Sequence, residues 1–137
     1  MVAHQGKWRK SPPELIDTLH EAAGAALPAD AAIDFRPMFG YPCYWVGGNM
    51  FFATHQENLI LRLSDEDRTA FLDIRDARLF EPMPGRPMKE YVVVPPEIVA
   101  DRAALQDWVM KGYRYVASLP PKETKAKKRS ATAKATG

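Results

Sequence analysis

Hydrophobic and polar positions alternate most regularly over residues 36–63, RPMFGYPCYWVGGNMFFATHQENLILRL. Alternation with a period of two is typical of β-strands. Gly47 and Gly48 interrupt it, and glycine accepts the positive φ angles that tight hairpin turns require. A second turn is expected at residues 55–58. The pattern therefore predicts three consecutive antiparallel strands.

The first hairpin also predicts which face each side chain occupies. Pairing Val46 with Asn49 sets Tyr44 opposite Phe51, and adjacent pairs then point to opposite faces. The face predicted to lie under helices holds Cys43, Trp45, Met50, Phe52, Leu59, Leu61 and Leu63. The other face is predicted to hold Tyr44, Phe51, Ala53, Ile60 and Arg62. That second face is unusually apolar, so either another part of the chain covers it or it contacts a partner or second copy.

Helical spacing flanks the strands at both ends of the chain. Ser11, Pro12 and Glu14 suggest a capping box, followed by an apolar stripe at residues 15, 19, 22, 23 and 26. Pro28 is expected to end this helix. Asp101 is expected to cap the last helix, in which Gly112 allows close approach to the sheet.

The region between these helices predicts further short elements. Ser64 is placed to cap a short helix, and the acidic residues that follow complement its dipole. Strands are expected at residues 77–81 and 88–94, with a rigid loop at 82–87. The resulting fold class is α+β: an antiparallel sheet of about five or six strands, a meander, packed against N- and C-terminal helices.

Length and charge set the domain organisation. A chain of 137 residues suits one domain with one hydrophobic core. We expect a flexible N-terminus at residues 1–10, the α+β domain at 11–119, and a disordered basic tail at 120–137. The net charge of +2 conceals an asymmetry, because the tail has six cations and one carboxylate, leaving the rest at −3. Such a tail is either a solvated end or a contact for nucleic acid phosphates.

Several classes of protein do not fit the sequence. No apolar run approaches the length needed to span a membrane, and the N-terminus has no secretory signal pattern, so a cytoplasmic location without membrane contact is expected. Cys43 is the only cysteine and cannot form an internal disulfide. Three isolated histidines predict no metal site, and no cofactor motif is present.

Catalytic chemistry is also not indicated. Cys43 and a histidine are the obvious nucleophile and base. In the predicted register, however, Cys43 faces the core while His55 points to the opposite side of the sheet. Carboxylates at residues 65–67, 73 and 76 are explained by a helix start and exposed turns. We therefore expect no catalytic residues.

The order of elements resembles the TfoX/Sxy N-terminal domain family over about residues 11–119. The residues that carry the resemblance are Met38, Phe39, Gly40, Gly47, Gly48, Met50, Phe51, Leu61, Arg62, Leu63, Pro87, Met88, Tyr91 and Pro95. The family is named after regulators of natural competence. The resemblance implies a single-domain member with a regulatory or binding role in transcription and no catalysis.

Three functional hypotheses remain from the sequence. In the first, a non-enzymatic adaptor contacts a protein partner through the face that includes Tyr44, Phe51, Ile60 and Arg62. In the second, the tail binds nucleic acid without sequence preference through Lys125, Lys127, Lys128 and Arg129. In the third, a cleft binds a small molecule. The chain is expected to be a monomer or a homodimer.

Overall fold

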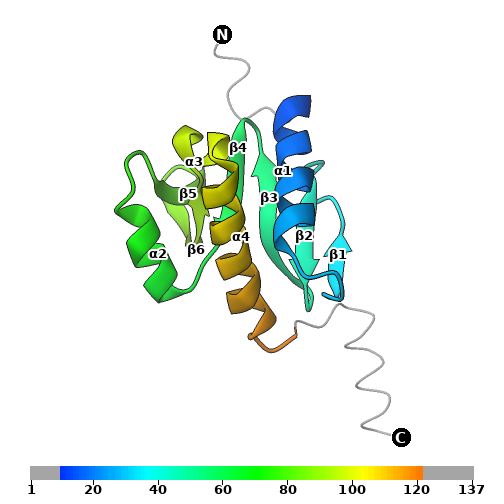
Figure 1. The fold of residues 1–137 in the computed structure, drawn as a ribbon. Helices are drawn as coiled ribbons and strands as arrows, with labels where there is room; N and C mark the ends of the chain where they lie inside the picture. The colour runs from blue at the N-terminus through cyan, green and yellow to red at the C-terminus, as the bar shows by residue number, and fades with distance from the viewer. Residues whose placement is uncertain (1–9, 122–137) are drawn as a thin grey trace, which may run out of the picture.

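A computed structural model describes residues 10–121 as a six-stranded antiparallel sheet with its helices on one side (Figure 1). The helices are α1 (Pro13–Ala26), α2 (Asp65–Leu72), α3 (Pro96–Ala100) and α4 (Arg102–Ala117). The strands are β1 (Ile33–Phe35), β2 (Cys43–Val46), β3 (Asn49–His55), β4 (Asn58–Arg62), β5 (Arg78–Met83) and β6 (Arg86–Val93). The α+β class expected from the sequence is confirmed.

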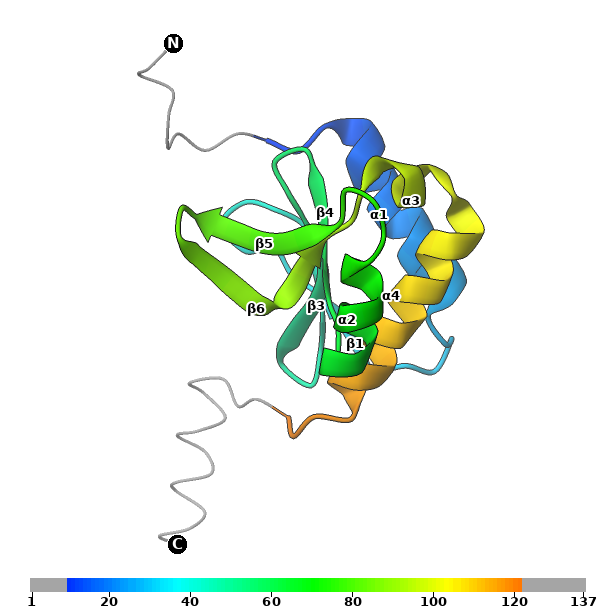
Figure 2. The same ribbon diagram turned by 90° about the vertical axis from the view of Figure 1, so that its left-hand side faces the viewer.

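The strand order is β1-β2-β3-β4-β6-β5. The first four strands form the expected meander, but β6 rather than β5 lies beside β4. Residues 82–87 are not a rigid loop, because they form the end of β5, a tight turn and the start of β6. Strands β5 and β6 therefore make a hairpin that projects away from the helices (Figure 2). We call this hairpin the arm.

The two long helices lie side by side across one face of the sheet (Figure 1). Leu19 of α1 and Leu105 and Val109 of α4 are fully buried there. Gly112 makes close packing possible, since an added Cβ would lie 2.8 Å from the carbonyl oxygen of Arg62. The predicted close approach at this glycine is confirmed.

Local signals placed most helix ends correctly. The side chains of Ser64 and Asp101 accept hydrogen bonds from Asp67 N and Ala104 N, each at 3.2 Å. The capping box at Ser11 is wrong, because α1 begins one residue later and its N-cap, Pro12, makes no side-chain bond. The Ser11 hydroxyl instead donates to Thr54 Oγ1 on β3, at 2.7 Å, and both residues are buried.

A β-bulge corrects the predicted face assignment. Trp45 pairs with Met50 as expected, but Tyr44 pairs with Phe52, so Phe51 is an extra residue on β3. The bulge reverses the parity of every residue beyond it on β2 relative to β3. Residues Cys43 and Trp45 consequently pack on the face away from the helices, whereas Phe51 lies in the helix-covered core.

Candidate functional site

The face of the sheet away from the helices carries two small apolar clusters joined by Tyr91. We call it the open face. Its members are Met38, Cys43, Trp45, Met50, Ala53, Ile60, Phe80, Met88, Tyr91 and Val93. The loop before β2 and the arm cover much of this face, so the prediction that another part of the chain covers it is confirmed. Ile60, for example, is only 1% exposed. Methionine and aromatic side chains dominate this surface, a composition typical of adaptable recognition sites.

A cavity of about 40 Å³ opens on this face. Its lining comes from the loop before β2, from the central strands and from Phe80 of the arm. The lining residues are Met38, Phe39, Tyr41, Cys43, Met50, Ala53, Thr54, His55, Ile60 and Phe80. The volume is little more than the roughly 30 Å³ that one water molecule occupies in the liquid.

Phe39 stands at the rim of this cavity in a conformation that an aromatic residue rarely adopts. Met38 and Tyr41 exchange two backbone hydrogen bonds, of 2.9 and 3.0 Å, around a tight turn in which Phe39 has φ 54° and Gly40 has φ 83°. A left-handed conformation costs a non-glycine residue on the order of 1 kcal/mol. The ring is nonetheless 83% exposed. Strain combined with an exposed aromatic ring is typical of a functional position.

Two arginines belong to the open face but are not among the residues that line the cavity. The Arg36 guanidinium lies over the Trp45 ring, 4.6 Å from its centre, while the indole donates to the Arg36 carbonyl at 3.0 Å. On the arm, Arg86 lies two residues before Met88 and so points to the same face. Its cross-strand partner, Met83, is 59% exposed.

Cys43 and His55 line the same cavity, so the prediction that they point to opposite sides of the sheet is wrong. The bulge is the cause, because Cys43 pairs with Ala53 instead of Phe52. Burial raises the pKa of the Cys43 thiol to about 11, and burial lowers the pKa of His55. The thiol donates to the Tyr41 carbonyl at 3.4 Å. A thiol that stays protonated at neutral pH is a poor nucleophile.

The four residues predicted as one contact surface do not lie together. Phe51 is fully buried and its ring packs against Tyr113 of α4. The Tyr44 ring lies toward α1, where its hydroxyl is 2.6 Å from His20 Nδ1. Ile60 is buried beneath the arm. Phe51 and Ile60 thus have no exposed surface through which to contact another protein.

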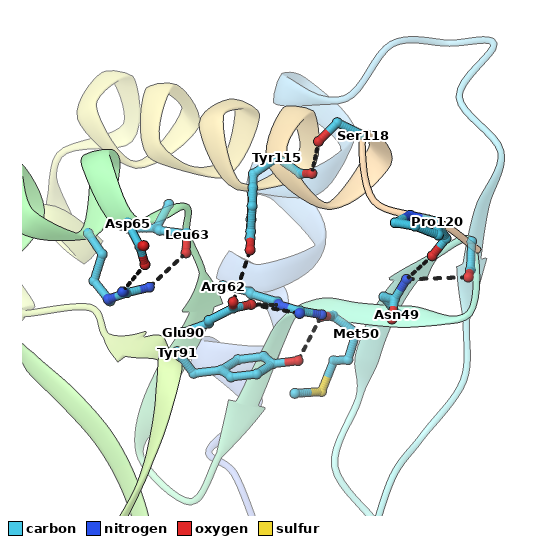
Figure 3. Close-up of polar contacts among 12 residues, drawn as sticks. Asn49, Met50, Arg62, Leu63, Asp65, Glu90, Tyr91, Tyr115, Ser118 and Pro120 are labelled. Atoms are coloured by element: carbon cyan, nitrogen blue, oxygen red, sulfur yellow. Dashed lines mark hydrogen bonds and ion pairs between the residues drawn. The ribbon is translucent and has the colours of Figure 1, made fainter. Parts of the chain in front are cut away.

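Arg62 belongs to a partly buried polar network between the sheet and α4 (Figure 3). Its Nε donates to Glu90 Oε1 at 2.7 Å, and the Tyr115 hydroxyl donates to Glu90 Oε2 at 3.0 Å. The guanidinium lies 5.6 Å from the centre of the Tyr91 ring and 5.8 Å from that of Tyr115. Glu90 thus accepts from both Arg62 on β4 and Tyr115 on α4, so this network links α4 to the sheet.

A larger and more open cleft of about 630 Å³ lies between the start of α1, the β3–β4 turn and α3. Its floor includes Leu15, Val94 and Val99, and its rim includes Asp76 and Arg78. The rim charges have both signs, and Asp76 on the rim has a positive φ of 67°, but no aromatic side chain lines the cleft. It is a weaker candidate than the open face.

Charge is distributed unequally between the helices and the sheet. The four helices contain eight carboxylates and four cations, whereas the six strands contain three carboxylates and four cations. Among residues 10–121, no group of three or more His, Cys, Asp or Glu side chains is placed to hold a metal ion. No helix in that range has the length and apolarity to cross a membrane. Residues Lys125, Lys127, Lys128 and Arg129 lie outside the described part of the chain.

Only one of the comparisons with known proteins gives a match. The model of the TfoX N-terminal domain matches residues 26–115, which include every strand and most of α4. No curated protein and no solved structure matches the chain significantly.

Proposed function

The chain belongs to the TfoX N-terminal domain family, and from this premise we propose that it is a non-enzymatic regulatory domain that acts in transcription by binding a protein partner. The open face is its contact surface. The observation that carries the proposal is Phe39, an aromatic ring at positive φ that is 83% exposed beside an apolar cavity.

The chemistry of the cavity supports binding rather than catalysis. Cys43 is the strongest nucleophile present, but its raised pKa keeps the thiol protonated. The lowered pKa of His55 keeps the imidazole neutral, and its ring packs between Tyr41 and Phe80 at centre distances of 5.0 Å. A cavity lined in this way favours an apolar group of a partner.

Site-specific crosslinking tests the proposal. The photoreactive residue p-benzoylphenylalanine replaces Phe39 in the full-length chain, expressed in its native host. Phe35 is the matched control position, because its ring is 49% exposed but lies near α1 with His20 and Tyr44. We expect one stoichiometric protein adduct from position 39 and none from position 35. Equal capture at both positions, or none at position 39, overturns the proposal.

A regulatory role requires a second measurement. The substitution Phe39→Asn removes the ring but keeps the turn, since Asn tolerates positive φ. Transcript levels in the native host should change with Phe39→Asn as they do when the gene is deleted, and should not change with Phe35→Ser. If Phe39→Asn behaves like wild type, the open face has no regulatory role.

The basic tail supplies a second candidate function, sequence-independent nucleic acid binding. Its excess of five positive charges favours phosphate contacts. Each released counterion contributes roughly −0.9 to the slope of log affinity against log salt concentration for duplex DNA, so a slope near −4.5 is expected. Deletion of residues 120–137 should abolish this binding. If the truncated chain binds duplex DNA as tightly as the whole chain, this candidate is wrong.

A further inference from the structure

We infer that the groove beside the start of α1 binds the chain's own residues 7–10, with the Trp8 indole on its apolar floor and the flanking cations at its rim. This contact is separate from the open face and goes beyond the proposed function. It follows from three features: the size of the groove, the point at which the chain enters it, and the chemistry of the segment.

Two hollows form this groove. The cleft of about 630 Å³ between α1, the β3–β4 turn and α3 adjoins a second hollow of about 390 Å³. Leu15, Glu57 and Val99 line both of them. The start of α1, the β3–β4 turn and α3 lie together at one end of the fold (Figure 1). We call the combined hollow the end groove.

The end groove has an apolar floor and is large enough for an aromatic ring. Its apolar lining residues are Leu15, Leu59, Ala77, Val93, Val94, Pro95, Pro96, Val99 and Ala100. Pockets of roughly 300–1,000 Å³ hold drug-sized ligands, so an indole fits in the larger hollow without displacement of its walls. Burial of an aromatic side chain there removes about 150–250 Å² of surface from water.

The chain enters the fold at the edge of this groove. Pro12 lines the smaller hollow, and the buried Ser11 hydroxyl donates to Thr54 Oγ1 at 2.7 Å. Trp8 is three residues before Ser11, and a chain spans at most roughly 3.3–3.6 Å per residue, so their Cα atoms lie within about 11 Å. Such a short tether gives a local concentration on the order of 1 mM. The chain's own segment therefore outcompetes that of a second copy in dilute solution.

Charge favours the same occupant. In the lining of the end groove carboxylates outnumber cations by three to one: Glu14, Glu57 and Asp76 against Arg78. Residues 7–10 are Lys-Trp-Arg-Lys, and residues 1–10 contain no carboxylate. Cations on both sides of the indole thus meet a rim of the opposite sign.

Crosslinking from position 8 tests the inference on the purified full-length chain. p-Benzoylphenylalanine replaces Trp8, which keeps an aromatic side chain there, and peptide mass spectrometry locates the adduct. We expect an adduct within one chain at lining residues such as Leu15, Val99 or Ala100. An adduct between two chains assigns the groove to a second copy, and an adduct elsewhere, or none, leaves the segment outside it. Each of these outcomes overturns the inference.

Filling the groove is a matched test of the same adduct. Ala100 is exposed and lines the groove, so Ala100→Phe should occupy the site of the indole without disturbing the core. Ala117 is an exposed alanine at the far end of α4, and Ala117→Phe is the control. The adduct yield should fall roughly threefold or more with Ala100→Phe and stay unchanged with Ala117→Phe. Equal yields from the two variants contradict the inference.

Neutralising the rim tests the charge. The double change Glu57→Gln and Asp76→Asn should lower the yield roughly two- to fivefold, as expected for two exposed charge pairs. Asparagine also tolerates the positive φ of Asp76. The control pair, Glu66→Gln and Asp107→Asn, removes two exposed carboxylates elsewhere and should have no effect. An equal loss from the control pair would mean that the rim carboxylates do not hold the segment.

Tryptophan emission supplies a measurement without the crosslinker. Subtraction of the Trp8→Phe spectrum from that of the unmodified chain isolates the emission of Trp8. We expect this emission at a shorter wavelength than that of tryptophan in water and protected from acrylamide, with both properties lost in Ala100→Phe. Emission identical to that of free tryptophan amide overturns the inference.

One variant separates this inference from the proposed function. Phe39→Asn should abolish partner capture by the open face but leave the adduct from position 8 unchanged. If Phe39→Asn removes that adduct, the segment lies on the open face and the assignment to the end groove is wrong. Loss of partner capture alone leaves the end groove and its occupant as inferred.

Discussion

The two faces of the sheet differ in what buries them. On one face, α1 and α4 cover large aliphatic and aromatic side chains such as Leu19, Phe52 and Val109, which are fully buried. On the open face, a loop and the arm cover smaller clusters, and Phe39 and Met83 remain exposed. The first face stores most of the hydrophobic free energy, whereas the second retains apolar surface available for recognition.

The bulge in β3 links these two roles. Because Phe51 is an extra residue, Phe51 and Phe52 both lie in the helix-covered core. Residues Cys43 and Met50 are left on the open face, where small and flexible side chains leave a cavity. One inserted residue thus enlarges the core on one side and creates the candidate site on the other.

The largest expected effect comes from removing the ring of Phe51, the extra residue of the bulge. The change Phe51→Ala should lower the free energy of unfolding by about 3–5 kcal/mol, because it leaves a large cavity among buried residues. Urea denaturation measures this loss. A loss below about 1 kcal/mol would indicate that Phe51 lies on the surface, as the unbulged register predicts.

Tight packing of α4 gives the next largest effect. In Gly112→Ala the new Cβ meets a backbone carbonyl and Leu61 Cδ1, each at 2.8 Å. Overpacking costs about 1–3 kcal/mol, and the better helix propensity of alanine offsets about 1 kcal/mol. A net loss of up to about 2 kcal/mol is expected by thermal or urea unfolding. The change Gly24→Ala on α1 is the control, since an added Cβ there meets nothing within 4 Å.

A small stabilisation is expected on the open face. Phe39→Asn relieves backbone strain in the turn and should raise the free energy of unfolding by about 0.5–1 kcal/mol. The same substitution should abolish partner capture. Stability gained together with binding lost would distinguish a recognition residue from a packing residue. Destabilisation by more than about 1 kcal/mol would mean that the ring supports the fold.

The smallest effect concerns acidification of the cavity. Burial lowers the pKa of His55 in the folded protein, and the nearby Glu57 only partly opposes this. The unfolded chain therefore binds the proton more readily, so stability should fall as the pH drops from above about 6.5 through the folded-state pKa. Unfolding measured across this range should show a smaller loss for His55→Gln. An identical pH profile for the two proteins would exclude this contribution.

The sequence by itself determined the features that depend on local chemistry. Gly47 and Gly48 adopt positive φ in the first hairpin, and Ser64 and Asp101 cap their helices. Gly112 marks the close approach of α4. Each signal is confined to a few neighbouring residues, so no knowledge of the rest of the chain is needed to recognise it.

Only the tertiary structure decided which side chains form the candidate site. Phe51 and Phe52 have equal apolar character, so alternation cannot show which of them is the extra residue, and one such residue reverses all parities beyond it. The exposure of Phe39 depends likewise on how the arm and the loop before β2 approach each other across the sheet. The sequence signal that could have pointed to Phe39 is Gly40, which follows it and marks a tight turn. Contacts between distant segments set register and exposure, and these are not encoded in any local pattern.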